Sequence, residues 1–168
     1  NTFDKINEAG KTILLFDNNN KKFTDKEIAA LDTFLKQKGS VIAFVDGVIV
    51  QDNLNTQPSV HNLNALFSKY GITINKDLVL STSSELVNFG NENVSFFTPY
   101  PLWVRTNKFE KAQSLFANIN YVTYPWVSSL TLKKTQNGQT TPLIYTVPKS
   151  WNQKDSFILN PQEIQPPK

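Results

Sequence analysis

Short apolar runs alternate with an amphipathic stretch over the first part of the chain. Residues 12–16 and 41–45 are apolar runs of the kind that forms strands buried on both faces of a parallel sheet. Between them, apolar residues recur at helical spacing over residues 28–35. A strand, a helix and a second strand in this order predict a right-handed parallel βαβ unit.

The helix of this unit carries signals at both ends. Thr24 and Glu27 form a capping box, in which each side chain accepts a hydrogen bond from the backbone N–H of the other residue. Lys36 and Lys38 lie at the carbonyl end, where the helix macrodipole favours cations. Gly39 is expected to take the left-handed position that closes the helix.

A second amphipathic helix is predicted over residues 60–70, with Ser59 as its N-cap and Gly71 as its stop. Over the rest of the chain, a short helix is predicted at residues 109–117. Extended segments are predicted at residues 72–74, 78–80, 94–98, 121–123, 130–132 and 143–147. The dipeptide at 137–138, Asn-Gly, predicts a hairpin turn between the last two strands. We therefore expect an α/β fold: a mainly parallel, flavodoxin-like sheet flanked by helices, with a late β-hairpin.

The length of 168 residues suits one domain. We assign residues 1–160 to this single α/β domain, and residues 161–168, with their prolines, to a linker that leaves it. A membrane-spanning helix needs about 20 apolar residues. The longest apolar stretch, residues 41–50, is interrupted by Asp46, so any membrane anchor is expected outside these residues.

Composition removes several classes of function. The chain has no cysteine, which excludes disulfides, thiolate catalysis and cysteine-based metal sites. The net charge of +3 is small and the lysines are scattered, whereas a nucleic-acid-binding protein concentrates its positive charge on one face. No nucleic-acid partner is therefore predicted. The absence of both cysteine and methionine is compatible with an oxidising, extracytoplasmic setting.

Residues suited to catalysis are few. His61 is the only histidine, and a surface or helix-start contact is expected of it rather than the role of a catalytic base. The glycines are isolated, so no phosphate-binding loop is predicted. We expect no enzyme activity and no cofactor. The alternative is a metal-dependent hydrolase that uses Asp46 and Asp52, which flank a strand end.

A proline–aromatic segment at residues 96–105, with a second at 124–126, is the most unusual feature of the sequence. Large amphipathic rings beside an arginine are favoured at binding surfaces, and rings with neutral polar neighbours also suit sugars. The candidate ligand-binding residues are Tyr100, Trp103, Arg105, Tyr124 and Trp126. The alternative, which we favour, is that the rings pack inside the domain and cover the open end of the sheet.

Three stretches, residues 23–46, 63–79 and 141–151, together resemble a known family, and shorter similar segments fall at 100–103 and 125–130. In this order they resemble the extracytoplasmic domain of the auxiliary subunits of uncharacterised ABC transport systems of the gliding-motility type. The resemblance implies a glutamine-amidotransferase-like fold that has lost its catalytic cysteine. It also implies a membrane-anchored subunit that works beside an ATPase and a permease.

The leading hypothesis is therefore a non-catalytic, extracytoplasmic domain of an ABC-transporter auxiliary protein, tethered to the membrane in the full-length protein. It would act by protein–protein contact, and its partners would be the permease and ATPase subunits. The alternative is a carbohydrate-binding module of the cell envelope, which would stack glycans on the four aromatic rings among the candidate residues.

Overall fold

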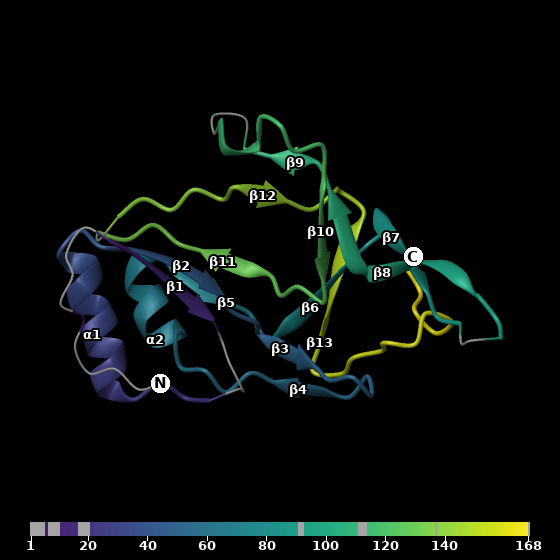
Figure 1. Cartoon of the computed structure of the whole chain (residues 1–168), viewed down its shortest axis with the longest axis horizontal. Coiled ribbons are helices and arrows are strands. Elements are labelled where there is room, and N and C mark those ends of the chain that lie inside the picture. The colour runs from purple at the N-terminus through teal and green to yellow at the C-terminus, as the bar shows by residue number, and fades with distance from the viewer. Residues whose placement is uncertain are drawn as a thin grey trace.

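The computed structural model describes residue 6 and residues 11–16, 21–90, 93–110, 114–136 and 138–167. The helices are α1 (Asp25–Lys36) and α2 (Asn64–Phe67), with 3₁₀ turns η1 (Ser68–Tyr70) and η2 (Ser114–Phe116). The strands are β1 (Thr12–Phe16), β2 (Ser40–Phe44), β3 (Val48–Val50), β4 (Thr56–Pro58), β5 (Ile72–Ile74), β6 (Asp77–Ser81), β7 (Ser84–Asn88), β8 (Phe97–Thr106), β9 (Lys108–Phe109), β10 (Val122–Pro125), β11 (Leu130–Leu132), β12 (Ile144–Tyr145) and β13 (Ser150–Lys154). Figure 1 shows an elongated molecule with both α-helices towards one end and the β7–β8 hairpin at the other.

Most of the regular structure in the described residues is strand, arranged in small sheets, so the predicted mainly parallel, flavodoxin-like α/β sheet is wrong. Among the described strands, β1 and β2 form the one parallel pair, and the other pairings are antiparallel. Strand β5 pairs with β11 and does not join β1 and β2, so the parallel sheet stops at two strands. The resemblance to a glutamine-amidotransferase-like fold also implied a mainly parallel sheet, and that part of the prediction is wrong for the same reason.

The expected late hairpin is also wrong. Strand β11 pairs with β5, and β12 pairs with β9, so these two late strands do not pair with each other. Asn137, of the expected turn, lies outside the described residues, and Thr135 and Gly138 form one isolated bridge. The second predicted helix shrinks to α2 and η1, whose N-cap is Leu63 and not Ser59. Gly71 does end it, at φ +81°.

Helix α1 confirms its capping box. The Glu27 N–H donates to Thr24 Oγ1 at 3.2 Å, and the Thr24 N–H donates to Glu27 Oε2 at 2.7 Å. The left-handed residue after the helix is Lys38, at φ +67°, so the role predicted for Gly39 is wrong. Glycine is still needed at position 39, because a Cβ there would lie 2.3 Å from the ring of Phe34.

Two hydrophobic clusters hold the molecule together. One packs around β6 and β8 and consists of Val48, Leu78, Leu80, Tyr100, Leu102, Leu159 and Ile164. The other lies between the helices and β1 and consists of Leu15, Leu31, Leu63 and Leu66. The domain boundary predicted at residue 160 stays a prediction, although Ile164 beyond it is buried in the first cluster.

A buried carboxylate joins three separate parts of the chain. All five residues of β6 are buried, and Asp77 at its start is completely inaccessible to solvent. Asp77 accepts hydrogen bonds from the Ser129 N–H at 2.8 Å, from Ser129 Oγ at 2.7 Å and from Asn152 Nδ2 at 2.7 Å. These contacts fix the segment before β11 and strand β13 against β6. Charge-assisted hydrogen bonds of this length are the stronger kind in proteins.

We expect Asp77→Ala to lower the free energy of unfolding by about 3 kcal/mol, because it removes a fully buried carboxylate that accepts three hydrogen bonds. Asp77→Asn keeps one acceptor oxygen, so its free energy of unfolding should lie between those of Asp77→Ala and the parent chain. Urea denaturation followed by tryptophan fluorescence measures both. Asp52→Ala, at an exposed position, is the control and should stay within about 0.5 kcal/mol of the parent. An equally stable Asp77→Ala protein would contradict this role.

Candidate functional site

Strand β8 carries most of the proline–aromatic segment and lies at the centre of a three-stranded sheet, in the order β10–β8–β7. Successive side chains of a strand point to opposite faces. Tyr100, Leu102 and Val104 alternate on the buried side, as their burial shows. Trp103 and Arg105 therefore belong to the opposite side. The alternation divides the candidate residues between two faces.

Tyr100 is buried in the core. Its side chain is 1% exposed, and its hydroxyl donates to the Leu159 carbonyl at 2.8 Å. Burial raises the pKa of Tyr100, and the neighbouring Trp126 side chain offsets part of that rise. Tyr124 lies opposite Val104 in the register, is partly buried, and has a pKa raised by the same cause. In this arrangement the Tyr100 ring offers no face to a ligand.

Trp103 and Trp126 pack against each other and against the first cluster. Their ring centroids lie 5.7 Å apart with an interplanar angle of 89°, an edge-to-face contact. The Trp126 backbone adopts a left-handed conformation, φ +49°, and its N–H donates to the Leu102 carbonyl at 2.8 Å. Among the described residues, the Trp103 indole nitrogen is buried without a hydrogen-bond partner. Both rings are therefore partly used as packing surface.

Arg105 is engaged by its neighbours on the sheet. Its guanidinium carbon lies 3.6 Å from the centroid of the Tyr121 ring, a cation–π contact, and Nη1 lies 3.9 Å from Glu85 Oε1. Thr123 Oγ1 donates to the other oxygen of Glu85 at 3.1 Å. Tyr100 and the Trp103–Trp126 pair are thus packed, and Tyr124 is half-buried. Because Arg105 is ion-paired, the five candidate residues do not form a single row of stacking rings.

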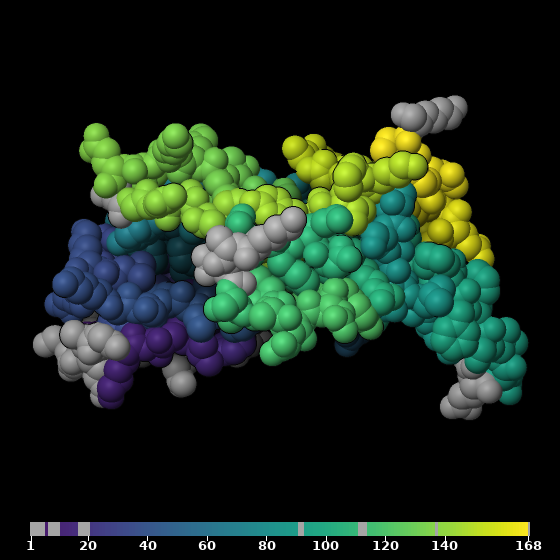
Figure 2. All heavy atoms as spheres, turned by 90° about the horizontal axis from the view of Figure 1, so that it is seen from above, coloured from purple at the N-terminus to yellow at the C-terminus, as the bar shows by residue number. Residues whose placement is uncertain are grey.

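The β7–β8 hairpin exposes apolar side chains that are not among the five candidate residues. We call them the hairpin patch: Leu86, Val94, Phe96 and Phe97. Leu86 and Phe97 are 60% and 63% exposed, on paired strands. Figure 2 shows this teal segment projecting from the end of the molecule. The doubled Phe96–Phe97 was a usable signal, but Leu86 joins the patch only through strand pairing.

Gly90 shapes the tip of this hairpin. A Cβ on Gly90 would lie 1.8 Å from the Val94 carbonyl oxygen, so the chain passes too close for any side chain. Asn88 Oδ1 accepts from the N–H groups of Gly90 and Phe96, at 2.9 and 3.1 Å. These contacts order the described part of the connection and hold its apolar side chains outward.

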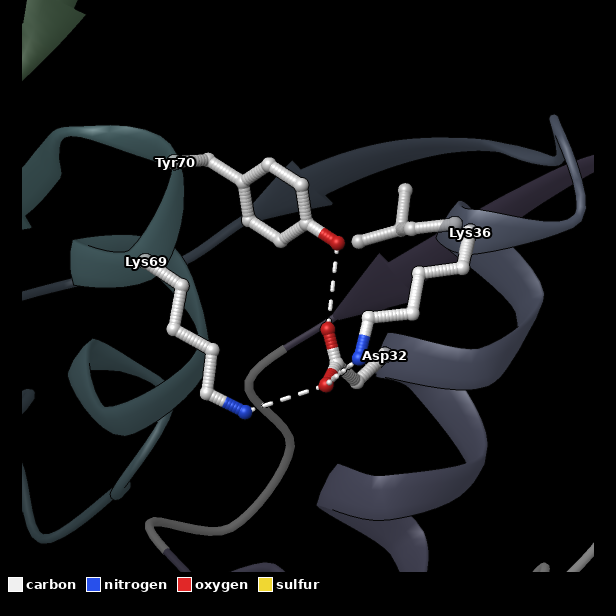
Figure 3. A pocket seen from close by; sticks show the side chains of 5 residues that line it. Asp32, Lys36, Lys69 and Tyr70 are labelled. Carbon is white, nitrogen blue, oxygen red and sulfur yellow. Dashed lines mark hydrogen bonds and ion pairs between the residues drawn. The ribbon is translucent and has the colours of Figure 1, made fainter. Parts of the chain in front are cut away.

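A polar pocket of about 400 Å³ lies between α1 and η1, and Figure 3 shows three donors turned towards one carboxylate in it. Lys36 Nζ and Lys69 Nζ each lie 3.0 Å from Asp32 Oδ2, and the Tyr70 hydroxyl donates to Asp32 Oδ1 at 3.1 Å. Leu35 completes the lining. The spacing of Asp32 and Lys36 by four residues was readable from the sequence, whereas Lys69 and Tyr70 come from a separate element.

The electrostatics of the pocket indicate that Asp32 has a structural role. Burial alone would raise the pKa of Asp32, but the hydrogen bonds from Lys36, Lys69 and Tyr70 outweigh it and lower the pKa below its ordinary value. Burial and the Asp32 carboxylate raise the pKa of Tyr70, so its hydroxyl stays protonated and donates. A carboxylate that is already matched by three donors is a poor nucleophile or base. Its evident effect is to join α1 to η1.

The remaining candidates for chemistry do not converge. The His61 Nδ1 atom accepts from the Leu63 N–H at 3.2 Å, a local contact at the start of α2. Asp46 and Asp52 are exposed, and within the described ranges no group of three or more His, Cys, Asp or Glu residues could hold a metal ion. Beside Asp46, the Gly47 N–H donates to Ser128 Oγ at 3.1 Å. The hydrolase alternative therefore has no third ligand in this part of the chain.

No described helix is both long and apolar enough to cross a lipid bilayer.

Comparison with known proteins identifies one family and one distant relative. The family model described as "ABC-type uncharacterized transport system" matches residues 3–168. An uncharacterized protein of Borreliella burgdorferi is 28% identical over 144 residues, which cover 83% of this chain. The matched part is 28% of that protein, so this chain spans little more than a quarter of its relative. No solved structure matches.

We expect Asp32→Asn to lower the free energy of unfolding at pH 7 by about 1–2 kcal/mol, a value discounted because both lysines are largely exposed. The folded-state pKa of Asp32 lies below its unfolded value near 3.8, so the stabilisation is fully present above that pH. It is lost as the pH falls through the folded-state value. Denaturant titrations of parent and variant should therefore converge in acid.

The control for this prediction is Asp52→Asn, since Asp52 is exposed. The free energy of unfolding of Asp52→Asn should equal that of the parent chain at every pH. A constant gap between Asp32→Asn and the parent, from neutral pH down to strong acid, would contradict the proposed ionisation.

Proposed function

This chain belongs to the ABC-type uncharacterized transport system family, whose model covers residues 3–168, and we propose that it is a non-catalytic domain that acts by protein–protein contact. Members of this family are auxiliary components of ABC-type transport systems. The proposed partners are the permease and ATPase subunits of such a system. We further propose an extracytoplasmic position and a membrane tether in the full-length protein, of the gliding-motility type.

The hairpin patch is the observation that carries this proposal. Exposed apolar side chains that gather on a projecting element are typical of protein-binding surfaces, and aromatic residues are enriched at their centres. Leu86 and Phe97 are each more than half exposed on an ordered hairpin, so contact with a partner would bury area without first ordering the strands. Arg105, stacked on Tyr121, adds a preorganised cation on the same sheet.

The chemistry of the described residues supports a binding role. Two buried acidic groups, Asp32 and Asp77, are each matched by three hydrogen-bond donors. The Nδ1 atom of the His61 ring accepts a hydrogen bond from the Leu63 backbone N–H, which is a local structural contact. These observations support the non-catalytic proposal, which a search for activity remains free to refute.

The carbohydrate-binding alternative has less support. It needed Tyr100, Trp103, Tyr124 and Trp126 as one stacking platform, but Tyr100 is buried and the two tryptophans contact each other edge to face. Sugars stack on open ring faces in rows. Protein contact through the hairpin patch therefore remains the one function that we propose.

We expect the double variant Leu86→Glu/Phe97→Glu to lose at least about tenfold of its recovery of permease and ATPase subunits in pulldowns from membranes, because two charges would enter an apolar contact. The measurement is quantitative immunoblotting or mass spectrometry of those named subunits. The matched control is Leu130→Glu, at a residue 58% exposed on β11. All three proteins should have similar melting temperatures.

Equal recovery by the double variant and the control would refute the hairpin patch as the binding surface. Recovery of neither subunit by the parent chain would count against the proposed function itself.

A further inference from the structure

The outer face of the β1–β2 sheet changes from polar to apolar along the strands. The parallel register places Thr12 beside Ser40, Leu14 beside Ile42 and Phe16 beside Phe44. The face thus runs from a polar pair through an aliphatic pair to an aromatic pair. The two phenylalanine rings are stacked, with centroids 5.0 Å apart and an interplanar angle of 6°.

This face is open to solvent in the structure. The four apolar side chains on it are between 49% and 57% exposed: Leu14 57%, Phe16 57%, Ile42 49% and Phe44 56%. They lie side by side in consecutive register pairs and so form one continuous patch. A continuous apolar patch on a sheet differs from scattered exposed hydrophobic residues, which need no explanation.

Both α-helices lie on the other side of the sheet. Leu15 points to that side, and it packs in one cluster with Leu31 of α1 and with Leu63 and Leu66 beside and within α2. Parallel sheets occur with both faces covered, usually by helices. The β1–β2 sheet has such a cover on one face, and the described residues leave the four apolar side chains of its other face largely exposed.

The size of the patch argues against a second copy of the chain as its cover. The exposed area of the four side chains is roughly 400–500 Å². A stable dimer buries about 800 Å² on each partner, and it must also offset the loss of translational and rotational freedom. A segment of the same polypeptide loses far less freedom on docking, so a small patch suffices for it.

The Borreliella relative is much longer than the region that matches this chain. Its match to this chain occupies 28% of its length, so most of that protein lies outside the matched region. We propose that, in the full-length polypeptide, an amphipathic α-helix from outside residues 1–168 packs over Leu14, Phe16, Ile42 and Phe44. Its apolar stripe covers the aliphatic and aromatic pairs, and polar residues lie over Thr12 and Ser40. This inference is independent of the proposed function, because it concerns a different face.

The absence of cysteine from the chain makes a direct test possible. Phe44→Cys places one thiol on the face, and Leu130→Cys places one at a matched exposure of 58% on β11. Maleimide labelling rates are compared between the 168-residue chain and the longest polypeptide that the gene encodes. We expect Cys at 44 to react at least about tenfold more slowly in the longer polypeptide, and Cys at 130 to react equally in both.

A second measurement guards against local effects of the cysteine. Phe44→Asp removes the stacking partner of Phe16 in both polypeptides, and it should lower the melting temperature of the longer polypeptide by several degrees more than that of the 168-residue chain. Equal labelling at position 44 in both polypeptides would overturn the proposal. So would protection within the 168-residue chain that rises with concentration together with a dimeric mass, or a gene that encodes no further residues.

Discussion

The buried carboxylate of Asp77 is the interaction on which the arrangement of strands depends. A charge without solvent access is tolerated in a protein only where donors surround it. Here the donors come from Ser129 and Asn152, 52 and 75 residues further along the chain. Each of these segments leads into or belongs to a strand, so satisfying one carboxylate positions β11 and β13 against the rest of the fold.

The first hydrophobic cluster forms around the strand that Asp77 begins. Leu78 and Leu80 of β6 pack with Tyr100 and Leu102 of β8, and this contact supports the long central strand of the three-stranded sheet. Because β8 is fixed along its buried face, its alternate residues are held on the opposite face. Phe97, the residue of the hairpin patch on β8, thus belongs to a strand whose other face packs in the core.

Local signals predicted only part of the local structure, because the roles predicted for Gly39 and Ser59 were wrong, and long-range pairing escaped them. The capping box of Thr24 and Glu27 was readable because its partners are three residues apart. The apolar runs of β1 and β2 were equally readable, but extending one βαβ unit to a whole parallel sheet was wrong, since nothing local to β5 reveals its pairing with β11. In the same way, the proline–aromatic segment was found, whereas alternation placed Tyr100 in the core and strand pairing brought Leu86 beside Pro99.

The two exposed apolar surfaces belong to sheets with different requirements. Antiparallel sheets, such as the one that carries the hairpin patch, are stable with one face in water. That surface is therefore suited to contacts that form and dissociate. A parallel sheet is found with both faces covered, so the stacked pair of Phe16 and Phe44 calls for a permanent cover. The direction of strand pairing, rather than the number of exposed apolar residues, thus separates a surface for a partner from a surface for the chain itself.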